Sequence, residues 1–304
     1  MGTKLSKPET PPNLVFFFGM AITTIAIFCI VAIQFYSFLL PPAPKQSKLA
    51  HSINENLILK PIVVSATPTS VATPTPIPYP PKDWHCVKVP ILMYHHVAPM
   101  EEARKEGHAP LTVDSGIFAS QMQYLADRGY RVITLQTLSD FFDAKENLPP
   151  KAVVLTFDDG YVDFYTHALP ILESHQYKSD LFVPTGLMEN PGYLTWEQIK
   201  SASTRGVRID HHTWSHANIA QTSETFFHRE LDIASQQLIE RGYGPTTIFA
   251  YPYGNHNGQD KIELSKRGFT LAVTTIQGQV QCKEDRLALR RTRVGNQSLK
   301  IYGL

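Results

Sequence analysis

The sequence AVVLTFDDGY at residues 152–161 decides the fold of this chain. Its first six residues are apolar apart from Thr156, and the acidic pair Asp158 and Asp159 follows immediately. A short apolar run that ends at a turn signal is typical of a buried strand. We therefore predict a strand at residues 152–157 with two carboxylates at its carboxyl end.

Apolar runs and amphipathic segments alternate on both sides of this strand. Further strands are predicted at residues 87–94, 131–134, 180–184, 207–210, 247–250 and 270–274. Helices are predicted at residues 115–128, 162–174 (with a bend at Pro170), 224–241 and 260–267. One more helix begins after Thr195, where Gln198 completes a capping box. This alternation predicts an α/β fold with a mainly parallel sheet, open or closed as a barrel.

The sequence HTWSH at residues 212–216 follows the predicted strand at 207–210. Its His212 and His216 are four positions apart, which would place both imidazoles on one side of a helical turn. The alternative is a pair of surface or core histidines. Together with one of the two carboxylates, the imidazoles would complete a three-ligand metal site with an open position, as in hydrolytic metal sites. The other carboxylate is then a candidate general base.

The residues before His212 are expected to differ in orientation. His211 should point away from the site, because neighbouring side chains on an extended segment face opposite sides. Asp210 should face the same way as His212, and it is a candidate acceptor for a hydrogen bond from that ring.

Other candidates follow predicted strands, where the functional residues of α/β barrels gather. His95 ends the first strand and is either a general acid or a packed, hydrogen-bonded histidine. The sequence YPYG at 251–254 predicts a rigid turn. Such a turn either aims a backbone N–H at a developing oxyanion or is only structural.

Two arginines and two tryptophans complete the candidates. Arg291 and Arg293 share one face of a predicted C-terminal strand, so one of them could reach the catalytic carboxylate; a solvated edge strand is the alternative. Trp196 and Trp214 are either walls on which a sugar stacks or ordinary buried aromatics.

The N-terminal part of the chain differs from the rest in composition. Residues 1–13 are polar and are expected in the cytoplasm, whereas residues 14–40 carry no charge and are long enough to span a bilayer. We expect an uncleaved signal anchor here; a cleaved signal peptide is the alternative. Residues 41–84 are predicted to be an extended Pro/Thr-rich linker. Residues 85–304 then form one folded, extracytoplasmic domain.

Charge and cysteine content narrow the function further. The formal net charge of +1 gives no support for nucleic-acid binding. The sequence has no Gly-rich phosphate loop and no dinucleotide fingerprint. Of the three cysteines, Cys29 lies in the apolar segment. Cys86 and Cys282 form either a disulfide, if the domain lies outside the cytoplasm, or two free thiols.

The ordered set of motifs resembles the polysaccharide deacetylase family, also called the NodB-homology domain or carbohydrate esterase family four. The motifs are VPILMYHHV at 89–97, VLTFDDGY at 154–161, YLTW at 193–196 and HTWSH at 212–216. The resemblance covers nearly all of residues 87–300. It implies a distorted parallel β/α barrel that removes acetyl groups from N-acetylglucosamine units with a divalent metal, zinc being the first candidate.

The resemblance also implies roles for individual residues. Asp158 matches the general base of the family. Asp159, His212 and His216 match its three metal ligands. Tyr253 matches the residue whose backbone N–H stabilises the oxyanion.

Two departures indicate a branch of the family. Ala250 stands where many members have an arginine, and no histidine follows His256, although many members supply a late histidine as general acid. Both features resemble the branch that deacetylates poly-β-1,6-N-acetylglucosamine of biofilms. In that branch the acid maps to His95, and Arg291 matches an arginine near the C-terminus.

The expected partners are an extracellular N-acetylglucosamine polysaccharide and, through residues 14–40, membrane lipid. Two other functions remain open from the sequence. One is deacetylation of peptidoglycan or a chitin-like β-1,4 polymer. The other is a catalytically weak protein that only binds polysaccharide. The oligomeric state is left open.

Overall fold

The computed structural model of the chain describes residues 86–304. The predicted cytoplasmic segment (1–13), membrane anchor (14–40) and linker (41–84) all lie outside the described residues. Within residues 86–304, no helix is both long enough and apolar enough to cross a membrane.

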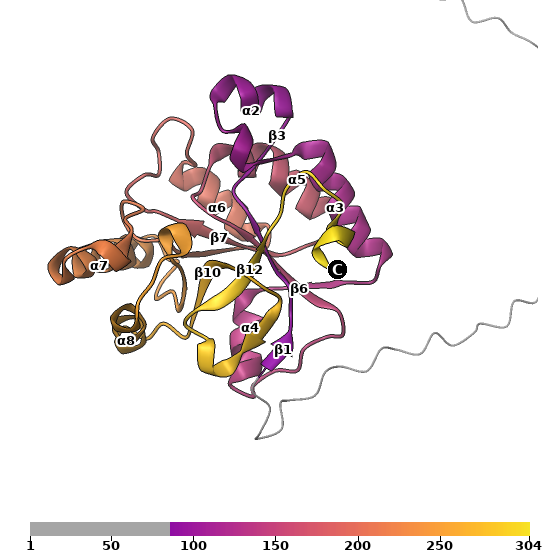
Figure 1. Cartoon of the computed structure of the whole chain (residues 1–304). Helices are drawn as coiled ribbons and strands as arrows, with labels where there is room; N and C mark the ends of the chain where they lie inside the picture. Colours follow the sequence, from indigo (N-terminus) through magenta and orange to yellow (C-terminus); the bar gives the residue numbers. More distant parts are fainter. Residues whose placement is uncertain (1–85) are drawn as a thin grey trace, which may run out of the picture. The chain divides into compact units, whose positions relative to one another are not determined.

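Seven parallel strands form a closed barrel, with helices around it (Figure 1). Around the barrel the order is β2 (Ile91–Tyr94), β12 (Leu289–Arg293), β10 (Leu271–Gln277), β9 (Ile248–Ala250), β8 (Val207–His211), β7 (Ser179–Val183) and β6 (Ala152–Phe157). Strand β6 pairs back with β2 and closes the ring. Strand β5 (Arg131–Ile133) pairs with the first half of β6, on the edge that β7 occupies further along.

Helices and two small sheets complete the domain. The helices are α2 (Met100–Glu106), α3 (Ser115–Asp127), α4 (Leu135–Phe142), α5 (Leu169–Ser174), α6 (Trp196–Thr204), α7 (Glu224–Glu240) and α8 (Gly258–Lys266). Short 3₁₀ segments occupy Ala109–Leu111, Ile219–Gln221, Pro252–Gly254, Lys283–Asp285 and Leu299–Tyr302, and a π-helical turn occupies Phe164–Ala168. The small sheets pair β1 (Cys86–Lys88) with β11 (Val280–Cys282), and β3 (His96–Ala98) with β4 (Thr112–Asp114).

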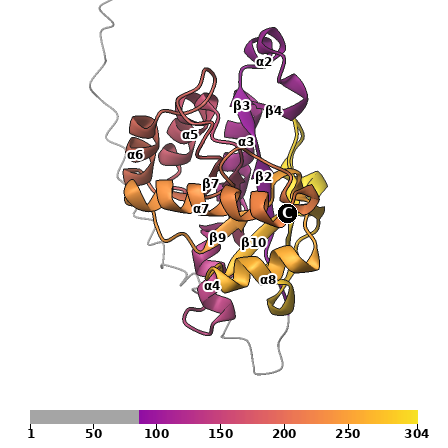
Figure 2. The ribbon, with the colours of Figure 1, turned by 90° about the vertical axis from the view of Figure 1, so that its left-hand side faces the viewer.

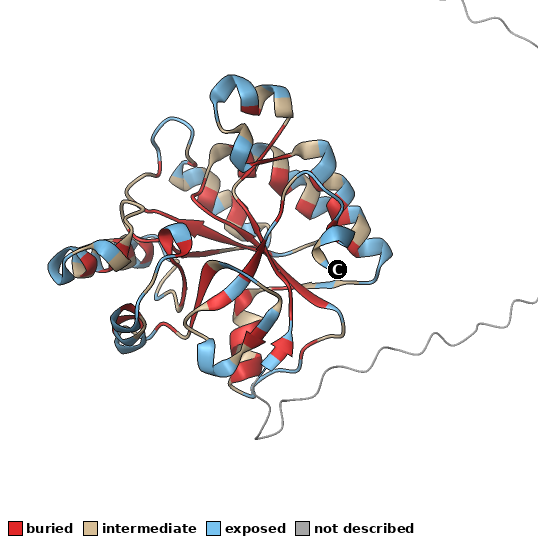
Figure 3. Cartoon of the chain, in the orientation of Figure 1, coloured by how far each residue is buried: buried red, intermediate tan, exposed pale blue. Residues whose placement is uncertain are grey.

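The burial of strand β6 explains why residues 152–157 are apolar apart from Thr156. All six of its residues are buried. Val153, Leu155 and Phe157 pack in the core cluster that includes helices α3, α5 and α6. Ala152 and Val154 pack in a second cluster that runs through the strands and helix α4. A strand that is covered on both faces is apolar at nearly every position. Figure 3 shows the central strands buried while the outer sides of the helices are exposed.

Helices α7 and α8 cover the side of the barrel formed by β9 and β10 (Figure 2). Phe227 and Leu231 of α7 and Leu264 of α8 are buried together with Phe249 of β9. Helix α7 is thereby fixed against the strands, directly after the segment that carries the two site histidines.

The structure departs from the predicted elements at several places. The strand predicted at 87–94 is split into β1 and β2, because Pro90 lacks the N–H that a continuous ladder needs. The helix predicted at 162–174 begins with a π-helical turn, and Pro170 lies in the first turn of the α-helix that follows. Helix α4, capped by Thr134, has no counterpart among the predicted elements. The capping box of Thr195 and Gln198 is confirmed.

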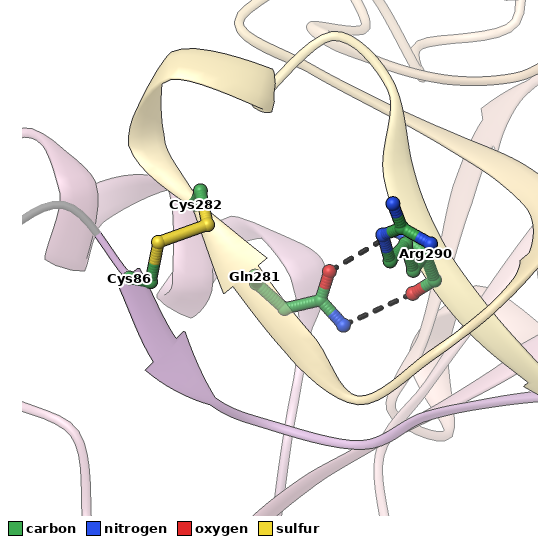
Figure 4. The surroundings of a disulfide bond; sticks show 4 residues. All are labelled: Cys86, Gln281, Cys282 and Arg290. Atoms are coloured by element: carbon green, nitrogen blue, oxygen red, sulfur yellow. Dashed lines mark hydrogen bonds between the residues drawn. A yellow bond between two sulfur atoms is a disulfide. The ribbon is translucent and has the colours of Figure 1, made fainter.

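A disulfide joins Cys86 to Cys282, so the first of the two alternatives for these cysteines holds (Figure 4). It links β1 to β11, which also pair as antiparallel strands. Next to it, the Gln281 side chain accepts a hydrogen bond from the backbone N–H of Arg290 and donates one to the Arg290 carbonyl. The disulfide therefore fixes the start of the described chain to β11, ahead of the first barrel strand.

Candidate metal centre

The two carboxylates after β6 diverge because the chain turns sharply there. Asp158 continues the strand, with its N–H bonded to the carbonyl of Tyr94. Asp159 and Gly160 then both adopt positive φ, at 74° and 67°. The turn therefore involves the aspartate as well as the glycine. As a result, the two neighbouring side chains point toward different partners.

Asp159, His212 and His216 converge on one point. The Nε2 atoms of His212 and His216 lie 3.2 and 3.1 Å from Asp159 Oδ1. Yet Oδ1 is buried and has no hydrogen-bond partner among the described residues. One ligand atom from each residue lies within 4.8 Å of the others. An orphaned buried oxygen facing two imidazole nitrogens is a donor set that fits a divalent metal, since one carboxylate and two histidines are common zinc ligands.

A backbone carbonyl orients His212. Its Nδ1 lies 2.7 Å from the carbonyl oxygen of Ala250, so Nδ1 donates and Nε2 is left to face Asp159. The prediction that Asp210 accepts this hydrogen bond is wrong. Asp210 instead accepts from Arg208 on the same strand, because the two side chains lie on the same face of β8.

The segment from His212 to His216 is an irregular loop, and the prediction of a helical turn is wrong. Thr213 and His216 have φ values of 66° and 60°, which a turn of right-handed helix does not contain. The prediction for His211 is confirmed, because its ring is fully buried away from the cluster, with Nε2 3.2 Å from the carbonyl oxygen of Leu231.

Asp158 forms an ion pair with a buried arginine. Nη1 and Nη2 of Arg291 donate to the two oxygens of Asp158 at 2.7 and 2.6 Å. Arg291 is fully buried, and it also donates to Thr156 Oγ1 and to the carbonyl of Thr274. Arg293 is exposed. Of the two candidate arginines, Arg291 is thus the one that reaches the carboxylate, through a bidentate fork that fixes both oxygens.

Charge partners keep both carboxyl groups ionised. Burial alone would raise the pKa of Asp158, but the Arg291 guanidinium outweighs it and the net pKa is lowered. For Asp159, burial is likewise outweighed by His212 and His216, which hold its pKa well below the usual range. The Asp159 carboxylate is therefore available to bind a cation, and the Asp158 carboxylate is available to accept a proton.

His95 stands beside Asp158. Its Nε2 lies 3.9 Å from Asp158 Oδ2. Burial lowers the pKa of His95, and the nearby carboxylates of Asp158 and Asp159 only partly oppose this. The ring also lines a cavity of about 330 Å³ that Arg293 and Tyr302 share. His95 is thus a neutral imidazole between a buried carboxylate and open space.

The turn at Pro252–Gly254 brings Tyr253 to the same place. Its ring packs edge-on against that of His216, with centroids 4.7 Å apart, and the residue is 60% exposed. Tyr253 has φ of 61°, which turns its backbone sharply at the site. The structure therefore brings together all seven residues predicted for the site: Asp158, Asp159, His212, His216, His95, Arg291 and Tyr253.

A second group of ligand-type residues lies nearby, and its geometry fits packing better than a metal. His96 Nδ1 is 2.6 Å from Asp163 Oδ2. The His96 ring is stacked between His108 and Tyr161, with centroids at 4.0 and 3.7 Å and angles of 15° and 18°. Nearly parallel stacked rings do not direct their nitrogens at a common point. The stack supports Tyr161, whose pKa is raised by burial and by the neighbouring Asp159 carboxylate.

Neither tryptophan is one of the residues of the metal-ligand cluster. Arg241 lies over Trp196 at 4.0 Å, and both line a surface groove that contains none of the candidate site residues. Arg229 lies over Trp214 at 5.2 Å. The ring of Trp214 also presses on Gly186, where an added Cβ would lie 2.4 Å from its Nε1. These contacts give both tryptophans structural partners.

Comparison with known proteins gives a consistent picture. The family model of polysaccharide deacetylases matches residues 145–272. A relative from Bacillus subtilis, YxkH, whose name includes the words polysaccharide deacetylase, is 30% identical over 68% of this chain and 71% of its own. The poly-β-1,6-N-acetyl-D-glucosamine N-deacetylase of Escherichia coli K12 is 26% identical over 63% of this chain, and the match spans only 35% of that protein.

Solved structures show the same likeness. The Streptococcus pyogenes deacetylase PplD, in complex with acetate, superposes with a TM-score of 0.64 at 31% identity, covering 68% of this chain and 92% of that one. IcaB from Ammonifex degensii superposes with a TM-score of 0.59 at 27% identity, covering 68% and 91%.

Proposed function

Because this chain belongs to the polysaccharide deacetylase family and is a hydrolase of N-acetyl groups, we propose that it deacetylates N-acetylglucosamine units of an extracellular polysaccharide, with poly-β-1,6-N-acetylglucosamine as the first candidate. One observation carries the proposal: the orphaned Asp159 Oδ1 faces two histidine nitrogens, directly beside a second carboxylate that an arginine holds ionised. The likeness to the E. coli enzyme supports the β-1,6 linkage.

We assign the metal to Asp159, His212 and His216, with zinc as the first candidate. A divalent cation held there would supply Lewis-acid polarisation of the acetamide carbonyl and would lower the pKa of water. The other steps belong to side chains and backbone of the chain itself.

Asp158 takes the proton from the attacking water as general base. The Arg291 fork keeps this carboxylate ionised and fixes its oxygens, so that a remaining lone pair can accept the proton. The backbone N–H of Tyr253 is assigned to stabilising the oxyanion that forms on the carbonyl oxygen when the carbonyl carbon is attacked.

His95 protonates the departing amine. It rests neutral because burial lowers its pKa, so it must first gain a proton. Asp158 holds the proton taken from the water and can pass it to His95, since Asp158 Oδ2 lies 3.9 Å from His95 Nε2. As the C–N bond breaks, His95 delivers a proton to the nitrogen, leaving acetate and a glucosamine unit.

The proposed location is the outer side of a membrane. Residues 14–40 would form a single-pass signal anchor and residues 41–84 a linker, with the catalytic domain outside the cytoplasm. The Cys86–Cys282 disulfide supports this placement, since disulfides persist in oxidising compartments.

Acetate release by the purified, zinc-loaded protein from β-1,6 and β-1,4 N-acetylglucosamine oligomers tests the proposal. Release from the β-1,6 series alone is expected. Release from the β-1,4 series alone would assign the protein to cell-wall or chitin-like polymers. No release from either, with zinc still bound, would overturn the enzymatic proposal in favour of polysaccharide binding.

A further inference from the structure

Glu230 of helix α7 holds the loop between the two histidine ligands by hydrogen bonds. This side chain is fully buried. Its Oε2 accepts the backbone N–H groups of Trp214 and Ser215 at 3.1 and 2.7 Å, and its Oε1 accepts the Ser215 hydroxyl at 2.7 Å. All three donors come from the two residues that lie just before His216. A carboxylate is costly to bury unless it is hydrogen-bonded, and here the loop supplies the bonds.

The loop needs these hydrogen bonds because its backbone is strained. Thr213 and His216 both adopt positive φ, a region that is unfavourable for a residue with a Cβ. Conformations of this kind persist only where the surroundings over-determine them. Without a fixed backbone at Trp214 and Ser215, His216 would be free to leave Asp159.

A second contact from α7 acts on the same loop. The backbone N–H of Thr213 donates to Nδ1 of His211 at 3.1 Å, so the His211 proton resides on Nε2. That Nε2 lies 3.2 Å from the carbonyl oxygen of Leu231, the residue after Glu230. Both ends of the loop are thereby connected by hydrogen bonds to one turn of α7. That helix is itself packed on the barrel.

We propose that Glu230 is a positioning residue that holds the 212–216 loop in its metal-binding shape and so sets the metal affinity of the centre. The inference rests on the proposed function, because it requires a metal at Asp159, His212 and His216. Glu230 touches neither the metal ligands' nitrogens nor the carboxylate, and it acts through the backbone between the histidines.

The zinc dissociation constant of the purified full-length protein tests this, measured by competition with a chromogenic chelator. Glu230→Ala is expected to raise the constant by about 10- to 100-fold, the usual effect of removing a group that orients a ligand. Glu230→Gln should bind nearly as tightly as the wild type. Its amide oxygen can accept both N–H groups, and its NH₂ can donate to the Ser215 hydroxyl oxygen.

Two further variants separate positioning from stability. Leu238→Ala removes a buried side chain from the same helix, away from the loop, so it should lower the melting temperature and leave zinc binding unchanged well below that temperature. If Glu230→Ala does not fold, Glu230→Asp decides the matter, because it keeps the charge but shortens the reach, and it should also weaken binding.

The outcomes distinguish this inference from the function beneath it. Wild-type protein that binds no zinc would overturn the proposed function and this inference with it. Wild-type protein that binds zinc, with folded Glu230→Ala or Glu230→Asp protein binding it equally well, would overturn the inference alone. An equal loss of affinity in Leu238→Ala would also overturn it, since general destabilisation would then explain the effect.

Discussion

Arg291 and Asp158 form a fully buried, bidentate ion pair at the centre of the site. Their geometry fixes the orientation of the carboxylate as well as its charge. A lysine could supply the charge, but it has no planar fork with which to hold both oxygens. The pair thus explains how a carboxylate next to the metal ligands is kept as a separate proton acceptor.

Arg291→Lys is therefore expected to lower kcat by about 10- to 100-fold while zinc content stays the same. Steady-state acetate release and metal analysis of the same preparation check this. Arg290→Lys, at an exposed position on the same strand, is the matched control and should retain activity. Wild-type kcat in the Arg291 variant would contradict the positioning role.

His95→Gln should lower kcat by about 10²- to 10⁴-fold, the usual contribution of a general acid. Zinc binding should not change, because His95 does not belong to the ligand cluster. The control is His175→Gln, whose ring stacks on Tyr177. If acetate release by the His95 variant matched the wild type, another group would have to protonate the amine.

At the level of single residues, the sequence predicted which residues lie together but not all of their contacts. Asp158, Asp159, His212 and His216 were predictable because their motifs follow strands that end at one rim. The partner of His212 was not, since a backbone carbonyl such as that of Ala250 has no sequence signature. Glu230 was missed, although an acid beside the apolar stripe of Phe227 and Leu231 is a signal for a buried carboxylate.

Among the elements, the predictions succeeded where side chains act locally. The capping box of α6 depends on residues three positions apart and was predicted correctly. The 212–216 loop was not, because a four-residue spacing suits a helical turn as well as a loop. The positive φ values of Thr213 and His216 are imposed by tertiary contacts from α7.

Gly186 provides a test of this loop from its other side. Its N–H donates to the carbonyl of Trp214 at 2.8 Å, and an added Cβ would lie 2.4 Å from the indole nitrogen. Gly186→Ala should therefore displace Trp214, cost about 1–3 kcal/mol of stability and weaken zinc binding. Gly258→Ala, where a Cβ meets nothing within 4 Å, is the control. Chemical denaturation and zinc titration report both effects, and unchanged values for Gly186→Ala would refute the described packing.

For the whole molecule, strand and helix alternation predicted a parallel sheet but left its closure open. Closure depends on β6 pairing with both β2 and β7, and these pairings join segments far apart in sequence. The resemblance to a known family supplied the barrel. The disulfide was likewise undecided, because only the fold shows that β1 and β11 lie side by side.

Replacing both Cys86 and Cys282 by serine should lower the unfolding free energy by about 2–4 kcal/mol, because the bond restricts the unfolded chain. It should leave kcat unchanged, since the bond precedes the first barrel strand while the site lies beyond the carboxyl ends of the strands. Urea denaturation and acetate release check the two halves of this prediction. Equal stability with and without the bond would contradict its structural role.

The division of labour between the two adjacent aspartates is the central claim, and one paired measurement tests it directly. Zinc content and acetate release are compared for Asp159→Ala and Asp158→Asn. We expect the Asp159 variant to lose zinc and activity together, and the Asp158 variant to keep its zinc while releasing no acetate. Full zinc content and a wild-type rate in Asp159→Ala would contradict the account.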